Sequence, residues 1–304
     1  MSKITKALEK AARDRARVEH EHATVTAKAT EVPVVAPVLV GTVASSRAIG
    51  SLRIDPHLVA SSDPRSPIAE QYRILRTNLQ SIKKLPELRS LLVTSSIRGE
   101  GKSITAINLA MTLAQQEGAR VLLIDADLRR GMLHHWLGFE AERGLSTLLT
   151  NGAQFDDLLI SFKDNGLSIL PAGPVPEQPS ELLDSSNMKL LLDRVRVRFD
   201  YVVIDSPPVL PVADPGILAR LVDGVLFVVR AGYTQQRTVM QAQSLLKQSK
   251  GRLIGSVLTH VEHYIPGYYL YYRYYRKEEE EGNGHGNGHN RLRRTAGLDK
   301  ETAS

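Results

Sequence analysis

Between residues 89 and 261, short apolar segments alternate with segments of helical character. The apolar segments read SLLVTS, RVLLID, LSILPAG, YVVIDSP, GVLFVVRA and LIGSVLTHV. Short, nearly continuous apolar runs of this kind are typical of parallel strands that helices cover on both faces. The pattern therefore predicts an α/β fold, a doubly wound and mostly parallel sheet with helices on both faces.

One helix is predicted before the first of these strands. Ser66 can cap its amino end, and Pro67 suits its first turn. In the following segment IAEQYRILRTNLQSI, apolar residues recur every three or four positions, namely Ile68, Tyr72, Leu75, Leu79 and Ile82. This spacing predicts a helix that buries one face.

The two ends of the chain have a different composition from the middle. Residues 3–20 indicate a short helix with a thin apolar stripe, either solvated or docked on a partner, and residues 23–60 read as a linker. After Gly267 the sequence turns to tyrosine, then acidic, then Gly/Asn/His residues, none of which could form a core. We expect an N-terminal helix and linker over residues 1–60, a folded domain over 61–265 and a flexible tail over 266–304.

Charge and composition exclude several classes of protein. The 39 basic and 33 acidic residues are interleaved, so the net charge of +6 does not imply a nucleic-acid partner. The absence of cysteine excludes disulfides and thiolate metal sites and fits the cytosol. The longest apolar run, residues 32–43, contains two prolines and is shorter than the ~20 residues that cross a bilayer. We expect a cytoplasmic protein without a secretory signal, which only a partner could hold at a membrane.

The segment LLVTSSIRGEGKSITAINLAMTLA places an apolar strand, a glycine loop and an apolar helix in succession. This is the context of a P-loop, in which backbone N–H groups and the helix amino end bind phosphate. Lys102 would reach the β- and γ-phosphates, and the Ser103 hydroxyl would bind Mg²⁺. The usual pattern has glycine at the position of Ser96, so a glycine turn with a chance lysine is the alternative. The predicted nucleotide-binding residues are Ser96, Arg98, Gly99, Glu100, Gly101, Lys102, Ser103 and Ile104.

Two apolar strands end in aspartate, one with Asp125 and Asp127 and the other with Asp205. The carboxyl ends of the strands are where a doubly wound sheet binds ligands, so these carboxylates should lie beside the phosphate loop. Asp205 would hold Mg²⁺, and Asp125 or Asp127 could accept a proton from an incoming hydroxyl. We expect Lys102, Asp125 and Asp127 to be catalytic and Ser103, Asp125 and Asp205 to be metal ligands. An aspartate at a strand end can also be an ordinary turn residue.

These motifs resemble those of the bacterial tyrosine kinases of capsule and exopolysaccharide systems. SSIRGEGKS resembles their Walker A motif, IDADLR their second aspartate-bearing Walker motif and VVIDSPP their Walker B motif, in the same order and spacing. The resemblance runs from about residue 50 to 276. It implies a P-loop fold of the deviant Walker A type and an ATP- and Mg²⁺-dependent autokinase that regulates polysaccharide synthesis and export.

The resemblance also assigns roles outside the P-loop. It implies ring-shaped homo-oligomers through Glu70, Arg73 and Arg76, for which an intrahelical ion-pair face is the alternative. Seven of the ten tyrosines lie within twelve residues where the tail begins and are the implied autophosphorylation sites: Tyr264, Tyr268, Tyr269, Tyr271, Tyr272, Tyr274 and Tyr275. An aromatic adhesive or a sheet-edge strand would be the alternatives for this cluster.

Family members pair with a membrane protein of polysaccharide export, so the resemblance implies an activator whose cytosolic tail completes the nucleotide site. The nearest rivals are the partition and division-site ATPases, which share the fold. They have a second lysine early in the loop, where this chain has Ile97, and this difference argues against them. A regulatory nucleotide-binding subunit without kinase activity is the third hypothesis.

Overall fold

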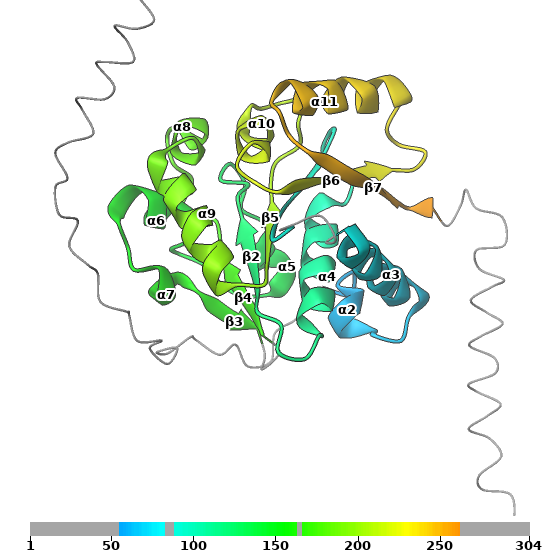
Figure 1. The fold of residues 1–304 in the computed structure, drawn as a ribbon, viewed down its shortest axis with the longest axis horizontal. Coiled ribbons are helices and arrows are strands. Elements are labelled where there is room, and N and C mark those ends of the chain that lie inside the picture. The colour runs from blue at the N-terminus through cyan, green and yellow to red at the C-terminus, as the bar shows by residue number, and fades with distance from the viewer. Residues whose placement is uncertain (1–54, 83–87, 163–165, 262–304) are drawn as a thin grey trace, which may run out of the picture. The chain divides into compact units, whose positions relative to one another are not determined.

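The computed structural model describes residues 55–82, 88–162 and 166–261 (Figure 1). They form a sheet of seven strands in the order β3-β4-β2-β5-β1-β6-β7. The strands are β1 (Ser90–Ser95), β2 (Val121–Asp125), β3 (Ile160–Phe162), β4 (Leu167–Leu170), β5 (Tyr201–Asp205), β6 (Gly224–Arg230) and β7 (Leu253–Thr259). Neighbouring strands are parallel except β3, which pairs antiparallel with β4 at the edge. The predicted α/β fold is confirmed, whereas the short strand β3 was not predicted.

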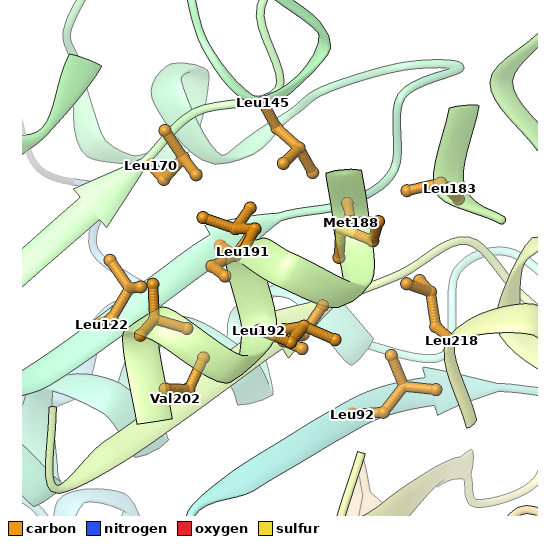
Figure 2. Close-up of a cluster of buried hydrophobic side chains, with 14 of the residues drawn as sticks. Leu92, Leu122, Leu145, Leu170, Leu183, Met188, Leu191, Leu192, Val202 and Leu218 are labelled. Carbon is orange, nitrogen blue, oxygen red and sulfur yellow. The ribbon is translucent and has the colours of Figure 1, made fainter. Parts of the chain in front are cut away.

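The central strands bury side chains on both of their faces, which explains their continuous apolar sequences. On one face, Leu92, Leu122 and Val202 pack against a cluster of apolar residues from the helices, including Met188, Leu191 and Leu192 (Figure 2). The elements that contribute to this layer include α6 (Leu145–Asn151), α7 (Phe155–Leu158), α8 (Pro179–Leu183), α9 (Ser186–Arg198), α10 (Asp214–Ala219) and α11 (Gln236–Gln248).

The other face of the sheet has its own core. The alternate residues Leu91, Val93, Leu123 and Val203 pack there. The helices on this side are α2 (Val59–Ser62), α3 (Pro67–Ile82), α4 (Lys102–Ala114) and α5 (Leu133–Leu137). Because the two cores use alternate residues of the same strands, the strand register determines both cores at once.

Helix α4 lies between the sheet and helices α2 and α3, which precede β1 in the chain (Figure 1). The Asn108 carboxamide accepts from Ala60 N at 3.0 Å and donates to the His57 carbonyl at 3.0 Å. Leu58 is fully buried in the same core. Residues 55–60, which the sequence placed in the linker, therefore pack against the helix that follows the P-loop.

The predicted start of α3 is confirmed, since Ala69 N donates to the Ser66 hydroxyl at 3.2 Å. Leu79 is buried, but Ile68 is 52% exposed and Ala69 is the buried residue of the first turn. The apolar stripe therefore starts one residue later than the spacing predicts. In the part of the chain that the structure describes, no helix is long and apolar enough to cross a bilayer.

Candidate nucleotide-binding and catalytic site

The predicted site residues converge at the carboxyl ends of three neighbouring strands, β2, β5 and β1. Asp125 of β2 pairs in register with Asp205 of β5, and Asp205 pairs with Val93 of β1. The P-loop leaves the end of β1 and leads directly into α4 at Lys102. Parallel strands thus place side chains that are 80 residues apart in sequence, Asp125 and Asp205, on the same rung of the sheet.

The P-loop has the backbone geometry that anion binding requires. Gly99 and Gly101 have φ angles of +81° and +91°, a conformation that side chains with a Cβ rarely adopt. Gly101 precedes the first turn of the 13-residue helix α4 and contributes no side-chain cap. The first N–H groups of α4 are thus available to bind a phosphate, which the helix dipole also favours.

Lys102 lies between the carboxylates. Its Nζ is 3.5 Å from Asp127 Oδ2, 3.6 Å from Asp205 Oδ1 and 3.0 Å from the Ser103 hydroxyl oxygen, to which it donates. Burial opposes the charge of Lys102, but Asp205, Asp127 and Asp125 outweigh that effect and raise its pKa. Lys102 therefore stays protonated and can neutralise part of the negative charge at this edge.

Three buried carboxylates nevertheless face a single lysine. Burial raises the pKa of Asp125 to about 8, and the neighbouring charge of Asp205 contributes in the same direction. Burial also raises the pKa of Asp205, against the opposing effect of Lys102. Burial is the main cause of both shifts, and because one lysine faces three carboxylates, the site favours a further cation.

The oxygen atoms that could accept such a cation can be identified from their hydrogen bonds. Both oxygens of Asp125 accept backbone N–H groups, from Asp127 at 3.2 Å and from Leu133 at 3.0 Å. Asp127 Oδ1 and Asp205 Oδ1 are buried and accept no hydrogen bond within the described residues. Carboxylate oxygens without a hydrogen bond fit Mg²⁺, which prefers oxygen ligands, although Asp205 Oδ1 also faces Lys102 Nζ at 3.6 Å. Within the described ranges no three acidic or histidine side chains could hold a metal by themselves, so Ser103 and phosphate oxygens would complete the set.

The other residues of the predicted phosphate loop differ in orientation. Arg98 is exposed, whereas Ser96 is buried and its hydroxyl has no hydrogen-bond partner among the described residues. Ile104 packs against the core, and the Glu100 carboxylate points into the protein, so these two could contact a nucleotide only through their backbone. Beside the loop is an open hollow of about 450 Å³, lined by Ile97, Arg98, Leu210, Pro211 and Tyr233.

Comparison with known proteins agrees with this geometry. The AAA domain family model matches residues 92–252. Tyrosine-protein kinase YwqD of Bacillus subtilis is 37% identical over 206 residues, which cover 68% of this chain and 86% of that protein. Tyrosine-protein kinase CpsD of Streptococcus agalactiae is 33% identical over 214 residues, which cover 69% and 91% of the two chains. The chain belongs to the bacterial tyrosine kinase family.

Solved structures of the family have the same fold as this kinase. The kinase domain of Escherichia coli tyrosine kinase ETK superposes with a TM-score of 0.65 at 31% identity, covering 69% of this chain and 82% of that one. The chimerical protein CapA2B2 superposes with a TM-score of 0.64 at 32% identity, covering 69% and 92% of the two chains. The P-loop and the aspartate-bearing strands of this kinase lie within the region matched by the family model.

One part of the site was missed by the sequence analysis. Arg129, which follows Asp127 in the same motif, forms an ion pair with the buried Asp214 through Nε and Oδ2 at 2.8 Å. The Ser180 hydroxyl donates to the other oxygen of Asp214 at 2.6 Å. Two distant segments, which bear Ser180 and Asp214, thus hold the chain just after Asp127. Only the arginine is part of a recognisable motif, so sequence alone gave no signal for its partners.

The residues predicted to form rings lie on α3. Glu70 and Arg73 form an ion pair at 2.5 Å within the helix, and Arg73 also donates to the Pro64 carbonyl. Arg76 donates to the Thr112 carbonyl on α4 at 2.8 Å, so it ties α3 to the helix that follows the P-loop. Oligomerisation through these residues stays a prediction. The seven tail tyrosines, Tyr264 to Tyr275, lie outside the described residues.

Proposed function

We propose that this tyrosine kinase binds Mg·ATP on the P-loop and transfers the γ-phosphoryl group to tyrosines of its own C-terminal tail. The single observation that best supports the proposal is the convergence of three buried aspartates and Lys102 beside a P-loop whose helix amino end is uncapped. Phosphoryl transfer needs little covalent chemistry from the protein and depends mainly on positioning and charge neutralisation.

Each residue of the site has a role in this proposal. The backbone of residues 99–103 and the Lys102 ammonium would bind the phosphates, and Ser103, Asp205 and Asp125 would hold the metal. Mg²⁺ would neutralise charge that develops on the phosphate oxygens. Among the described residues Asp127 Oδ1 has no hydrogen-bond partner, unlike either oxygen of Asp125, and this favours Asp127 as the acceptor of the tyrosine proton. Asp125 then orients the chain that bears Asp127 and Leu133.

The acceptor tyrosine would reach the phosphate from a neighbouring copy. The open hollow beside the P-loop is lined by apolar side chains and by Arg98, which suits a phenol ring on a charged peptide. We propose that Glu70, Arg73 and Arg76 support a ring that presents each tail to the next subunit. Phosphorylation adds roughly −1.5 to −2 charges per tyrosine, so phosphorylated tails should leave the carboxylate-rich site and loosen the ring.

We further propose that the cytosolic tail of a membrane protein of polysaccharide export activates this kinase and recruits it to the inner face of the membrane. Such a partner would complete the nucleotide site. The isolated protein should then be a slow kinase. Addition of the activator's cytosolic segment should raise the rate, and full activity without it would contradict this part of the proposal.

The experiment that tests the function is incubation of the full chain with γ-labelled ATP and Mg²⁺. Label on tyrosine supports the kinase, release of free phosphate alone supports an ATPase, and neither result supports a regulatory nucleotide-binding subunit. Lys102→Ala should reduce tyrosine labelling by about 100-fold or more, because it removes the one lysine that pairs with these carboxylates in the described part of the chain. The matched control is Lys189→Ala, since Lys189 is exposed on α9. Wild-type labelling by the Lys102 variant would overturn the site assignment.

A further inference from the structure

The P-loop of this kinase contains a carboxylate, which is unexpected in a loop that binds anions. Glu100 lies between Gly99 and Gly101, and a carboxylate directed at the bound phosphates would weaken their binding by charge repulsion. The Glu100 side chain is fully buried instead. Its position therefore needs an explanation other than contact with the nucleotide.

Both carboxylate oxygens of Glu100 are engaged inside the protein. Oε2 accepts the backbone N–H of Ile97, three residues earlier in the same loop, at 2.7 Å. Oε1 accepts the hydroxyl of Thr234 at 2.6 Å, and Thr234 lies between β6 and α11, 134 residues away in sequence. Hydrogen bonds to an ionised acceptor are roughly twice as strong as neutral ones, so these two contacts are strong constraints on the loop.

Two further contacts join the same part of the loop to the ends of β6 and β7. The Thr259 hydroxyl at the end of β7 donates to the Glu100 carbonyl at 2.9 Å. Arg230 at the end of β6 donates to the Gly99 carbonyl at 3.3 Å. The P-loop is therefore fastened to the β6 and β7 side of the sheet as well as to β1, from which it emerges.

We infer that Glu100 is a positioning residue that holds the P-loop in its phosphate-binding conformation by joining Ile97 N to Thr234. The carboxylate closes the loop on itself and anchors it to the β6–α11 connection. The backbone N–H groups of the loop are then already in place before the nucleotide binds. This favours binding, because less conformational entropy is lost when the phosphates are bound. This inference rests on the proposed function, because it concerns the nucleotide site of the same kinase.

The contacts also separate this role from a chemical one. A general base or a metal ligand needs a carboxylate oxygen that can reach the reacting group or the ion. In Glu100 both oxygens accept hydrogen bonds from protein donors, whereas Asp127 and Asp205 each have a buried oxygen without a hydrogen bond among the described residues. A glutamine could replace Glu100 in the structural role, since its amide oxygen can accept from Ile97 N and its NH₂ group can donate to the Thr234 hydroxyl.

The test is a comparison of Glu100→Ala with Glu100→Gln in the full chain, with binding of Mg·ADP and Mg·ATP measured by calorimetry and tyrosine labelling measured separately. We expect Glu100→Ala to weaken nucleotide binding by about 10- to 100-fold, the range expected for lost charge-assisted hydrogen bonds. The KM for ATP should rise in parallel, while kcat at saturating ATP should stay within about 3-fold, as for a loss of ground-state binding. Glu100→Gln should recover most of the lost affinity.

A second pair of variants tests the anchor. Thr234→Val removes the hydroxyl that contacts Glu100 and should weaken nucleotide binding, whereas Thr234→Ser keeps the hydroxyl and should restore it. Glu100→Ala and Thr234→Val together should weaken binding by less than the product of their separate effects, because both break the same contact. Glu117→Ala is the matched control, since Glu117 is exposed just after α4.

Three results would overturn the inference. Unchanged nucleotide affinity in Glu100→Ala would show that the loop keeps its conformation without the carboxylate. A fall in kcat well beyond about 3-fold in both the glutamine and the alanine variants would indicate a chemical role for the charge. Multiplicative effects of the Glu100 and Thr234 variants would show that they act separately. If wild type itself binds no nucleotide, the proposed function fails, and that outcome is visible before any variant is compared.

Discussion

Acidic residues at the two ends of the parallel strands differ in how fully their carboxylate oxygens are hydrogen-bonded. At the amino ends, Asp223 Oδ2 accepts from Arg89 N at 3.0 Å and from both Ser90 N and the Ser90 hydroxyl at 2.7 Å. Its other oxygen is 3.6 Å from Arg196. At the carboxyl ends, Asp127 and Asp205 each keep a buried oxygen without a hydrogen bond among the described residues.

The difference separates acidic residues whose contacts stabilise the fold from those that we propose serve the reaction. A carboxylate that accepts several hydrogen bonds and faces an arginine contributes to stability. Carboxylates gathered around one lysine repel one another and lower the stability of the fold. A bound metal and nucleotide can offset this loss. The comparison therefore predicts opposite effects when equivalent substitutions are made at the two ends.

The largest expected effect is that of Asp205→Asn on phosphoryl transfer. If Asp205 holds the metal as proposed, its loss should reduce tyrosine labelling by about 10³-fold, because the proposed catalysis depends mainly on charge neutralisation. Asp223→Asn, the same substitution at the amino ends, should leave labelling within about 3-fold of wild type. Comparable losses in both variants, measured with γ-labelled ATP at saturating concentration, would remove the distinction between the two ends.

The next effect concerns stability at the amino ends. Asp223→Ala should lower the free energy of unfolding by about 1–3 kcal/mol, because Ser90 N and Arg89 N lose their acceptor. Urea denaturation monitored by circular dichroism measures this change. Asp205→Ala, studied in the same way without metal or nucleotide, should not destabilise and serves as the counterpart. If Asp205→Ala lowered the free energy of unfolding more than Asp223→Ala, the Asp205 carboxylate would have better partners than the geometry indicates.

A pH dependence should distinguish Asp125 as well. Its pKa is about 8 in the folded protein against 3.8 for an ordinary aspartate, so between these values the folded state holds a proton that the unfolded state has lost. Wild-type stability should therefore decrease as pH rises through this window, and Asp125→Asn should lack this contribution. In EDTA, the melting temperature of wild type relative to the variant should fall by about 2–6 °C between pH 5 and 9. If the melting temperatures of wild type and Asp125→Asn changed with pH in parallel, the raised pKa of Asp125 would be contradicted. Asp193→Asn is the control, because the Asp193 side chain is exposed.

The smallest effect is expected at an exposed pair of the amino ends. Arg120 lies 3.2 Å from Asp200, but 59% of its side chain is exposed to solvent. Arg120→Ala should therefore change the free energy of unfolding by less than about 0.5 kcal/mol, and added salt should reduce the difference further. A loss above 1 kcal/mol in urea denaturation would show that exposure is a poor guide to the value of these pairs.

The sequence was informative where structure depends on neighbouring residues. Apolar runs indicated the strands, glycine and lysine spacing indicated the P-loop, and Ser66 marked the start of α3. It was uninformative where structure depends on distant contacts. Leu58 lies in a segment without periodicity, yet it is buried against the far side of α4. β3 has only three residues, too few for a pattern.

The site shows the same division. Asp125, Asp127, Lys102 and Asp205 were predicted because each follows a recognisable strand or loop pattern, and the sheet brings them together. The distant residues that hold the segments around them were not predicted. Asp214 meets Arg129 from 85 residues away, and Thr234 meets Glu100 from 134 residues away. Contacts of this kind follow from the tertiary fold, so residue types and local spacing cannot reveal them.

The pairing of Asp125 with Asp205 in the same register also limits which sequence changes this enzyme can accept. Adjacent strands are ~4.8 Å apart, and one residue advances a strand by ~3.3 Å. The geometry of the sheet therefore fixes the positions of the two carboxylates relative to each other. Inserting or deleting one residue in either strand would displace a carboxylate and turn its apolar side chains toward the wrong core. Natural or laboratory selection for new acceptor peptides should therefore act on the loops, including residues 97–98 and 210–211 beside the hollow, and leave strand lengths unchanged.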